Sequence, residues 1–257
     1  MIKIGPAGTS GLGYEDGFAK CKELNLNALE VEFTHGIHMN NSAAKEVGDL
    51  ARKSNVELSI HCPYFINLTS NEKKKIEASK KRILDSCERG HFLNAHYIVF
   101  HAAYYGKYSK EECYNIVKKE ILEMQNTIKK NKWNVILAPE TTGKASQFGT
   151  AEELLRLSKE TGCSFCIDFS HLLARNGKLD YDELFNKLKH IKHLHCHFSG
   201  IEYTDKGERR HIITPADKIK ELLKYVKKYN KDVTIINESP DPFGDCEKTK
   251  KVLNQLD

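Results

Sequence analysis

The sequence predicts an α/β protein built as a single (β/α)8 TIM barrel, with one catalytic domain over residues 1–257. Eight short apolar segments alternate with eight helix-like segments along the whole chain, which is typical of a parallel sheet closed into a barrel. The apolar segments are nearly continuous hydrophobic runs, as expected for parallel strands buried on both faces. A doubly wound open sheet is the competing arrangement, but eight units in about 250 residues favour the closed barrel.

The expected elements follow one another in strict alternation. Strands are expected at 2–5, 28–33, 56–61, 97–101, 135–140, 165–168, 191–197 and 233–238. Helices are expected at 14–24, 43–54, 70–90, 110–130, 150–161, 181–188, 215–229 and 245–256. The glycine-rich segment after the first strand matches neither GxGxxG nor a P-loop, so no nucleotide site is predicted there. The longest connection, 199–215, is expected to be a loop.

The composition is that of an ordinary globular protein, with 40% hydrophobic and 29% charged residues. A net charge of +5 permits an anionic partner without requiring one. No apolar run approaches the roughly 20 residues that span a bilayer, and the first residues lead directly into a strand rather than a secretory signal. The eight scattered cysteines favour a reduced environment. We therefore expect a cytoplasmic monomer without membrane association.

The strands end in a recurrent type of residue. Six of them finish in a side chain that commonly binds metals, and two further histidines follow in the connections. The strand-end residues are His61, His101, Glu140, Asp168, His197 and Glu238, and the additional histidines are His171 and His211. In barrels of this kind the active site lies at the carboxyl ends of the strands, so these side chains should converge on one face.

Five histidines combined with three carboxylates favour zinc, manganese or iron over calcium or magnesium. They are more ligands than one ion needs, so a cluster of two or three ions is predicted. Such clusters generate hydroxide at neutral pH and neutralise an anionic centre, which suits phosphoester hydrolysis. An aldose isomerase is the alternative, although isomerase sites depend more on carboxylates than this histidine-rich set.

Several segments, in order along the chain, resemble endonuclease IV, the abasic-site nuclease family within the xylose-isomerase-like barrels. Segment 60–68, Ile-His-Cys-Pro-Tyr-Phe-Ile-Asn-Leu, is similar to its His, Tyr and Ile-Asn-Leu segment, and Phe100-His101 to its strand-four histidine. Segment 139–143, Pro-Glu-Thr-Thr-Gly, resembles its Glu-Asn-Thr-Ala-Gly. Segment 166–171, Cys-Ile-Asp-Phe-Ser-His, is the closest match, and 237–240, Asn-Glu-Ser-Pro, resembles the family's Glu-Thr-Pro.

The resemblance implies a role for each strand-end residue. Glu140 would bridge two ions, with His61 and His101 completing the first site. Asp168, His197 and Glu238 would complete the second, and His171 and His211 would hold a third. Glu140, Asp168 and Glu238 would be the catalytic residues. The implied activity is cleavage by metal-activated hydroxide on the 5′ side of abasic sites in DNA, with zinc as the metal and manganese as an alternative.

Two departures from the family stand out. Its third site uses Asp-Arg-His, but here the triplet is Arg209-Arg210-His211. Either Glu208 or Asp205 replaces the carboxylate, or the third site is weak, or Arg209 contacts phosphate instead of an ion. The second departure lies on strand seven, where His193, His195 and His197 alternate. We prefer His197 as the ligand because it ends the strand, and expect His195 one layer deeper.

Four residues are predicted to bind the substrate: Tyr64, Asn67, Arg209 and Arg210. Tyr64 and Asn67 follow strand three, where the family directs side chains toward DNA, although a simply packed loop is equally consistent with the sequence. Three functions remain in view: an abasic-site endonuclease, a sugar isomerase or epimerase of the same superfamily, and a DNA-binding barrel without catalysis.

Overall fold

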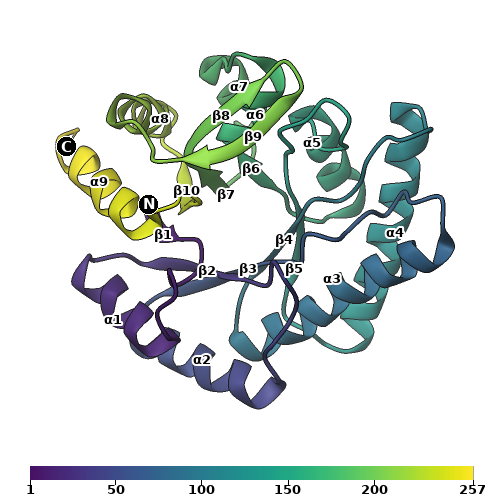
Figure 1. The fold of residues 1–257 in the computed structure, drawn as a ribbon, viewed down its shortest axis with the longest axis horizontal. Helices are drawn as coiled ribbons and strands as arrows, with labels where there is room; N and C mark the ends of the chain where they lie inside the picture. Colours follow the sequence, from purple (N-terminus) through teal and green to yellow (C-terminus); the bar gives the residue numbers. More distant parts are fainter. Residues whose placement is uncertain (257) are drawn as a thin grey trace.

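The structure is a computed structural model that describes residues 1–256, and it confirms the (β/α)8 barrel (Figure 1). The barrel strands are β1 Ile2–Pro6, β2 Ala28–Glu32, β3 Glu57–His61, β4 Tyr97–Phe100, β5 Ile136–Pro139, β6 Cys166–Asp168, β7 His193–Phe198 and β10 Asp232–Asn237. They form two parallel sheets, β1-β10-β7-β6 and β2-β3-β4-β5. Single parallel bridges, Ala7 with Glu30 and Glu140 with Cys166, join the sheets at both junctions. All carboxyl ends of the strands therefore point the same way.

The helices lie outside the ring of strands (Figure 1). They are α1 Tyr14–Glu23, α2 Asn41–Lys53, α3 Lys73–Leu93, α4 Lys110–Lys130, α5 Ala151–Thr161, α6 Phe169–Asn176, α7 Tyr181–Lys187, α8 Ala216–Lys228 and α9 Pro242–Asn254. No helix in this described part of the chain is long and apolar enough to cross a membrane.

Local sequence explains where several helices begin. The hydroxyls of Ser109 and Thr150 accept hydrogen bonds from the backbone N–H groups of Glu112 and Glu153, and each glutamate bonds back to the capping residue. These reciprocal capping boxes satisfy N–H groups that have no partner within the helix. Helix α4 therefore has the predicted bounds, and α5 begins one residue after the predicted start.

Two expectations about the connections were wrong. Segment 199–215 is not a loop, because it contains an antiparallel hairpin of β8 Gly200–Thr204 and β9 Gly207–Ile212. In addition, α6 was not predicted, although it follows β6 directly. Its start is fixed by Asp168, whose carboxylate accepts a hydrogen bond from the backbone N–H of His171 at 2.8 Å. The Asp-x-x-His spacing is therefore a helix cap as well as a pair of site residues.

The main apolar core lies between the strands and the helices. Leu29 and Val31 of β2, for example, belong to the same buried cluster as Phe18 of α1 and Ala44 of α2. The inside of the barrel is different, because the buried residues there are mostly small or polar, apart from a small cluster of Val99, Ala138 and Cys166. Barrels of this type usually fill the interior with bulky aliphatic layers.

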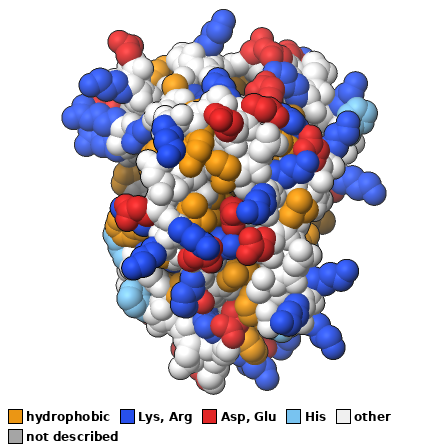
Figure 2. Space-filling model, turned by 90° about the vertical axis from the view of Figure 1, so that its right-hand side faces the viewer, with side chains coloured by type: hydrophobic (Ala, Val, Ile, Leu, Met, Phe, Trp, Pro, Cys, Tyr) orange, Lys and Arg blue, Asp and Glu red, His pale blue; other side chains and the backbone are white. Residues whose placement is uncertain are grey.

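Charged side chains of both signs are interspersed on the face that lies to the right in Figure 1 (Figure 2). Ion pairs link α4 and α5, including Lys118 with Glu160 at 2.8 Å and Arg156 with Glu111 at 2.7 Å. These pairs neutralise part of the basic charge of the two helices.

Candidate metal centre

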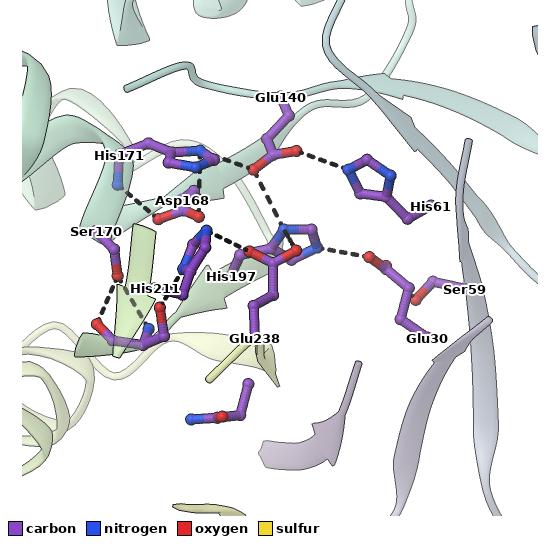
Figure 3. Close-up of polar contacts among 12 residues, drawn as sticks. Glu30, Ser59, His61, Glu140, Asp168, Ser170, His171, His197, His211 and Glu238 are labelled. Carbon is purple, nitrogen blue, oxygen red and sulfur yellow. Dashed lines mark hydrogen bonds and ion pairs between the residues drawn. The ribbon is translucent and has the colours of Figure 1, made fainter. Parts of the chain in front are cut away.

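The eight predicted ligands come together at the carboxyl end of the barrel, and Figure 3 labels all of them except His101. His61 and Asp168 are the last residues of β3 and β6, while His101, Glu140 and Glu238 directly follow β4, β5 and β10. The other three are His197 on β7, His171 in the first turn of α6 and His211 on β9. Residues separated by up to 177 positions meet because every barrel strand runs in the same direction (61 to 238).

Glu140 lies at the centre of the cluster, and its side chain is fully buried. Its Oε2 is 3.3 Å from Nε2 of His61 and 3.1 Å from Nε2 of His101. Its Oε1 is 3.1 Å from Nδ1 of His171 and 3.2 Å from Nδ1 of His197. One carboxylate thus faces four imidazoles, two with each oxygen, which is the arrangement that a bridging ligand requires.

The ligands form three groups, and within each group the potential ligand atoms lie within 4.8 Å of one another. The groups are His61, His101 and Glu140; then Glu140, Asp168, His197 and Glu238; then Asp168, His171 and His211. Glu140 is shared by the first two groups and Asp168 by the last two. The three groups are therefore adjacent.

The donor set suits divalent cations. Oδ2 of Asp168, Nε2 of His171 and Oε2 of Glu238 are buried but make no hydrogen bond. Leaving such atoms without a partner costs about 1–3 kcal/mol each, which a bound cation would offset. Imidazole nitrogens with carboxylate oxygens are typical ligands of zinc and manganese. The residues thus fit the predicted metals.

The buried carboxylates and imidazoles of the cluster shift one another's pKa values. Burial opposes ionisation of Glu140, but His101 and His197 outweigh it and hold its pKa well below the ordinary value. Burial likewise opposes protonation of His61, yet Glu140 and Glu32 raise its pKa to about 10. Burial and the neighbouring Glu30 and Glu238 raise the pKa of Glu32 to about 8. Metal ions would replace these protons.

The β8–β9 hairpin supplies a carboxylate to the third group through a β-bulge. Glu202 pairs with Arg210 and Tyr203 pairs with Glu208, so Arg209 is the extra, unpaired residue. A bulge of this kind re-aims side chains on the bulged strand. Glu208 consequently lies on the same side as His211, with its Oε2 at 3.4 Å from Nε2 of His171.

The side chains of Arg209 and Arg210 do not join the ligand groups. Arg209 and Arg210 both form ion pairs with Glu202, at 2.8 and 2.7 Å, and their side chains are 67% and 69% exposed. Neither lies among the ligand groups, so their contact with substrate phosphate stays a prediction. Of the alternatives for the missing carboxylate, the geometry favours Glu208.

The two inner histidines of β7 have different neighbours. Nδ1 of His197 is 3.2 Å from both Glu140 and Glu238. His195 is one layer deeper, where its Nε2 bonds to Glu30 at 3.0 Å and its ring stacks on Tyr97. This placement agrees with the preference for His197 at the ligand cluster.

Sequence reasoning missed Glu30 and Glu32, which project into the barrel from β2. Together with Glu238 they form a further group of carboxylates within 4.8 Å. Burial opposes ionisation of Glu30, but His197 and His195 lower its pKa below the ordinary value. Only the last residue of each strand was considered, and strand two was assigned to end in Phe33. The available indication was Glu-Val-Glu, two carboxylates on one face of an otherwise apolar strand.

Tyr64 and Asn67 follow β3 and have different environments. Tyr64 is 58% exposed at the rim of the site, with its ring edge-on to His61 at 5.9 Å between centroids. Phe65, which was not predicted, is 73% exposed beside it. Oδ1 of Asn67 instead accepts hydrogen bonds from the backbone N–H and the hydroxyl of Thr69. Asn67 thus holds the loop in shape, whereas Tyr64 and Phe65 are accessible to a large ligand.

The fold and this ligand arrangement define a class of barrel. The model of the family described as xylose isomerase-like TIM barrel matches residues 18–256, and the chain belongs to this family. MJ0133, an uncharacterized protein of Methanocaldococcus jannaschii, is 36% identical, with 100% of this chain and 98% of that protein aligned. A probable endonuclease 4 of Mycoplasmopsis synoviae is 27% identical over 72% of this chain and 69% of its own length.

Solved structures with the same fold include both nuclease and epimerase types. Endonuclease IV from Thermus thermophilus aligns with a TM-score of 0.69 and 16% identity, covering 98% of this chain and 99% of its own. A D-tagatose 3-epimerase-like protein aligns with a TM-score of 0.75 and 21% identity, covering 98% and 96%. At these identities the likeness shows the shared fold, and the choice of activity depends on the site.

Proposed function

We propose that this chain is a metal-dependent endonuclease that hydrolyses the phosphodiester on the 5′ side of abasic sites in DNA. The observation that carries the proposal is the set of three adjacent ligand groups that share Glu140 and Asp168. A cluster of two or three zinc ions is suited to neutralising a phosphate and its departing oxygen. The similarity to proteins described as endonuclease 4 supports the same activity.

Each group of residues has its own task in this proposal. His61, His101 and Glu140 hold one ion, and Glu140, Asp168, His197 and Glu238 hold a second. Asp168, His171, His211 and Glu208 hold a third. Bound ions supply positive charge and lower the pKa of water. Manganese is an alternative to zinc for the same ligands.

The rim residues recognise DNA rather than take part in the chemistry. Tyr64 is exposed at the edge of the ligand cluster, with its ring 5.9 Å from that of His61, and the next residue, Phe65, is also exposed. Exposed aromatic rings can stack on unpaired or displaced bases. An abasic site offers such an opening in a duplex because one base is missing from the stack. The exposed aromatic pair therefore supports a damaged-DNA substrate over a small sugar.

A sugar epimerase or isomerase is the second candidate. Its support is specific: Glu140, Asp168, His197 and Glu238 alone make one carboxylate-rich group, and the epimerase-like structure shares the fold. That reaction leaves no evident task for the outer histidines His61, His101 and His211. The endonuclease assigns all of them as ligands, so we favour it.

The test is a nicking assay on a duplex with a single tetrahydrofuran abasic analogue, with zinc and with chelator. We expect a nick 5′ to the lesion that chelation abolishes, an intact control duplex that is spared, and loss of activity in Glu140→Gln. Absence of nicking with zinc or manganese, together with metal-dependent turnover of a free ketose, would replace this proposal with the epimerase.

A further inference from the structure

A buried carboxylate of β2 lies behind the ligand cluster and belongs to none of the three groups of predicted ligands, although it forms the separate carboxylate group with Glu32 and Glu238. Glu30 is fully buried inside the barrel. Its Oε1 is 2.8 Å from Nε2 of His197, and its Oε2 is 3.0 Å from Nε2 of His195. The hydroxyl of Ser59 donates a hydrogen bond to the same Oε2 at 2.6 Å. Figure 3 shows Glu30 on the far side of the His197 ring from Glu140.

The imidazole of His197 is therefore held between carboxylates on both sides. Nδ1 faces Glu140 and Glu238 at 3.2 Å. Nε2 lies within ion-pair distance of Oε1 of Glu30, and neither of these two buried atoms has another hydrogen-bond partner. The ring is completely buried. Only Nδ1 is placed to bind an ion in the cluster, and this requires that the remaining ring proton be on Nε2.

We infer that Glu30 is a positioning residue that fixes His197 with its Nε2–H toward β2 and its Nδ1 toward the metal ions. Metal-binding histidines commonly direct their second nitrogen to a carboxylate, which sets the tautomer and the ring orientation. The inference rests on the metal centre of the proposed function, but it is independent of which substrate that centre acts on.

His195 and Ser59 hold Glu30 in turn. A buried carboxylate is costly unless its oxygens have partners, and these two residues provide donors for the oxygen that does not face His197. The polar residues beneath the cluster therefore form a chain of support, from Ser59 and His195 through Glu30 to His197. This accounts for a second buried histidine two positions before the ligand.

Zinc affinity, measured by competition with a chromophoric chelator, tests the inference without DNA. Glu30→Gln keeps the side-chain shape and removes the charge, and we expect roughly 10–100-fold weaker zinc binding, as for loss of an outer carboxylate. Ser59→Ala, a milder change, should weaken binding in the same direction by less. Thr234→Val is the matched control, because Thr234 lies inside the same barrel but contacts His193 at 3.1 Å rather than Glu30.

A spectroscopic measurement separates positioning from a general loss of structure. In zinc-loaded protein labelled with nitrogen-15, we expect a downfield, slowly exchanging Nε2 proton on His197, which Glu30→Gln shifts upfield. Circular dichroism checks that each variant is folded. Zinc affinity equal to that of wild type in folded Glu30→Gln would overturn the inference. A wild-type protein that binds zinc but fails to nick DNA would contradict only the proposed function.

Discussion

The carboxylate of Glu208 lies 3.4 Å from Nε2 of His171, although one residue is on the β8–β9 hairpin and the other in the first turn of α6. Gly143, after β5, allows this approach. A Cβ there would lie 2.6 Å from Cβ and 2.8 Å from Oε2 of Glu208, closer than real contacts permit. The bulge at Arg209 and the absence of a side chain at Gly143 together bring a carboxylate to the third ligand group.

Removal of the Glu208 carboxylate should empty the third site selectively. We expect Glu208→Ala to bind one zinc ion fewer per chain than wild type, measured by elemental analysis after dialysis against a fixed low zinc concentration. Arg209→Ala is the matched control, because Arg209 is exposed and paired with Glu202. A lower zinc content in Arg209→Ala, with Glu208→Ala unchanged, would contradict this assignment.

Loss of Glu140 should affect more than one ion. Because its two oxygens face different pairs of histidines, Glu140→Gln removes the charge that the first and second groups share. We expect a loss of one to two zinc ions and a fall in nicking rate of at least about 100-fold, the size typical of removing one transition-state contact. Glu153→Gln, on α5 away from the cluster, should retain the wild-type metal content. Unchanged zinc content in Glu140→Gln would rule out a bridging role.

Zinc uptake should release protons near neutral pH. The pKa of His61 is raised to about 10 in the metal-free protein, and those of His171 and His197 are also raised, so the imidazoles carry protons that metal ions displace. Calorimetry in two buffers of different ionisation enthalpy at pH 7 should detect at least one proton per chain, and zinc affinity should rise with pH. Binding without proton release would show that the histidines are not the ligands.

The same shifts predict how pH affects the metal-free protein. The stabilisation from protonated His61 is complete below its unfolded pKa of about 6.5 and is lost as pH rises through about 10. The pKa of Glu32 is likewise raised, to about 8. Its protonated form therefore stabilises the folded protein, and this contribution is also lost as pH rises through about 8. Denaturant unfolding in chelator should therefore show lower stability at pH 9 than at pH 6. Saturating zinc should reduce or reverse this difference.

The exposed aromatic pair should matter for DNA and not for metal. We expect Tyr64→Ala and Phe65→Ala each to weaken binding of abasic duplex by roughly 1–3 kcal/mol, the usual range for a stacked base. Zinc content should not change, because neither side chain is among the ligand groups. Fluorescence anisotropy with labelled abasic duplex measures the effect. Wild-type affinity in both variants would mean that the rim does not contact DNA.

Much of the fold followed from the sequence because its determinants are local. Apolar runs and their alternation with helix-like segments predicted the order of the barrel elements, and parallel strands then made their carboxyl ends converge. The eight ligands at strand ends and in the connections were accessible to this reasoning. Their spatial grouping agrees with it, whereas their binding of metal stays a prediction.

What was missed depends on contacts across the barrel. The bulge that turns Glu208 inward is defined by the pairing of β8 with β9, and no residue type in 199–215 predicts it. The role of Glu30 becomes apparent only from its contacts with His195 and His197, which come from β7 on the other sheet. Helix α6 was overlooked because Asp168 was interpreted as a ligand alone, although an Asp before a helical segment is also a common cap.

The interior of this barrel is lined mainly by polar and small side chains, while the apolar core forms a ring between strands and helices. The apolar packing that stabilises the fold and the polar residues of the candidate site thus lie in separate layers of the barrel. Substitutions of the inner residues can therefore change the candidate site while the outer apolar core keeps the chain folded. In the absence of ions, that outer core alone must hold together an interior crowded with charge.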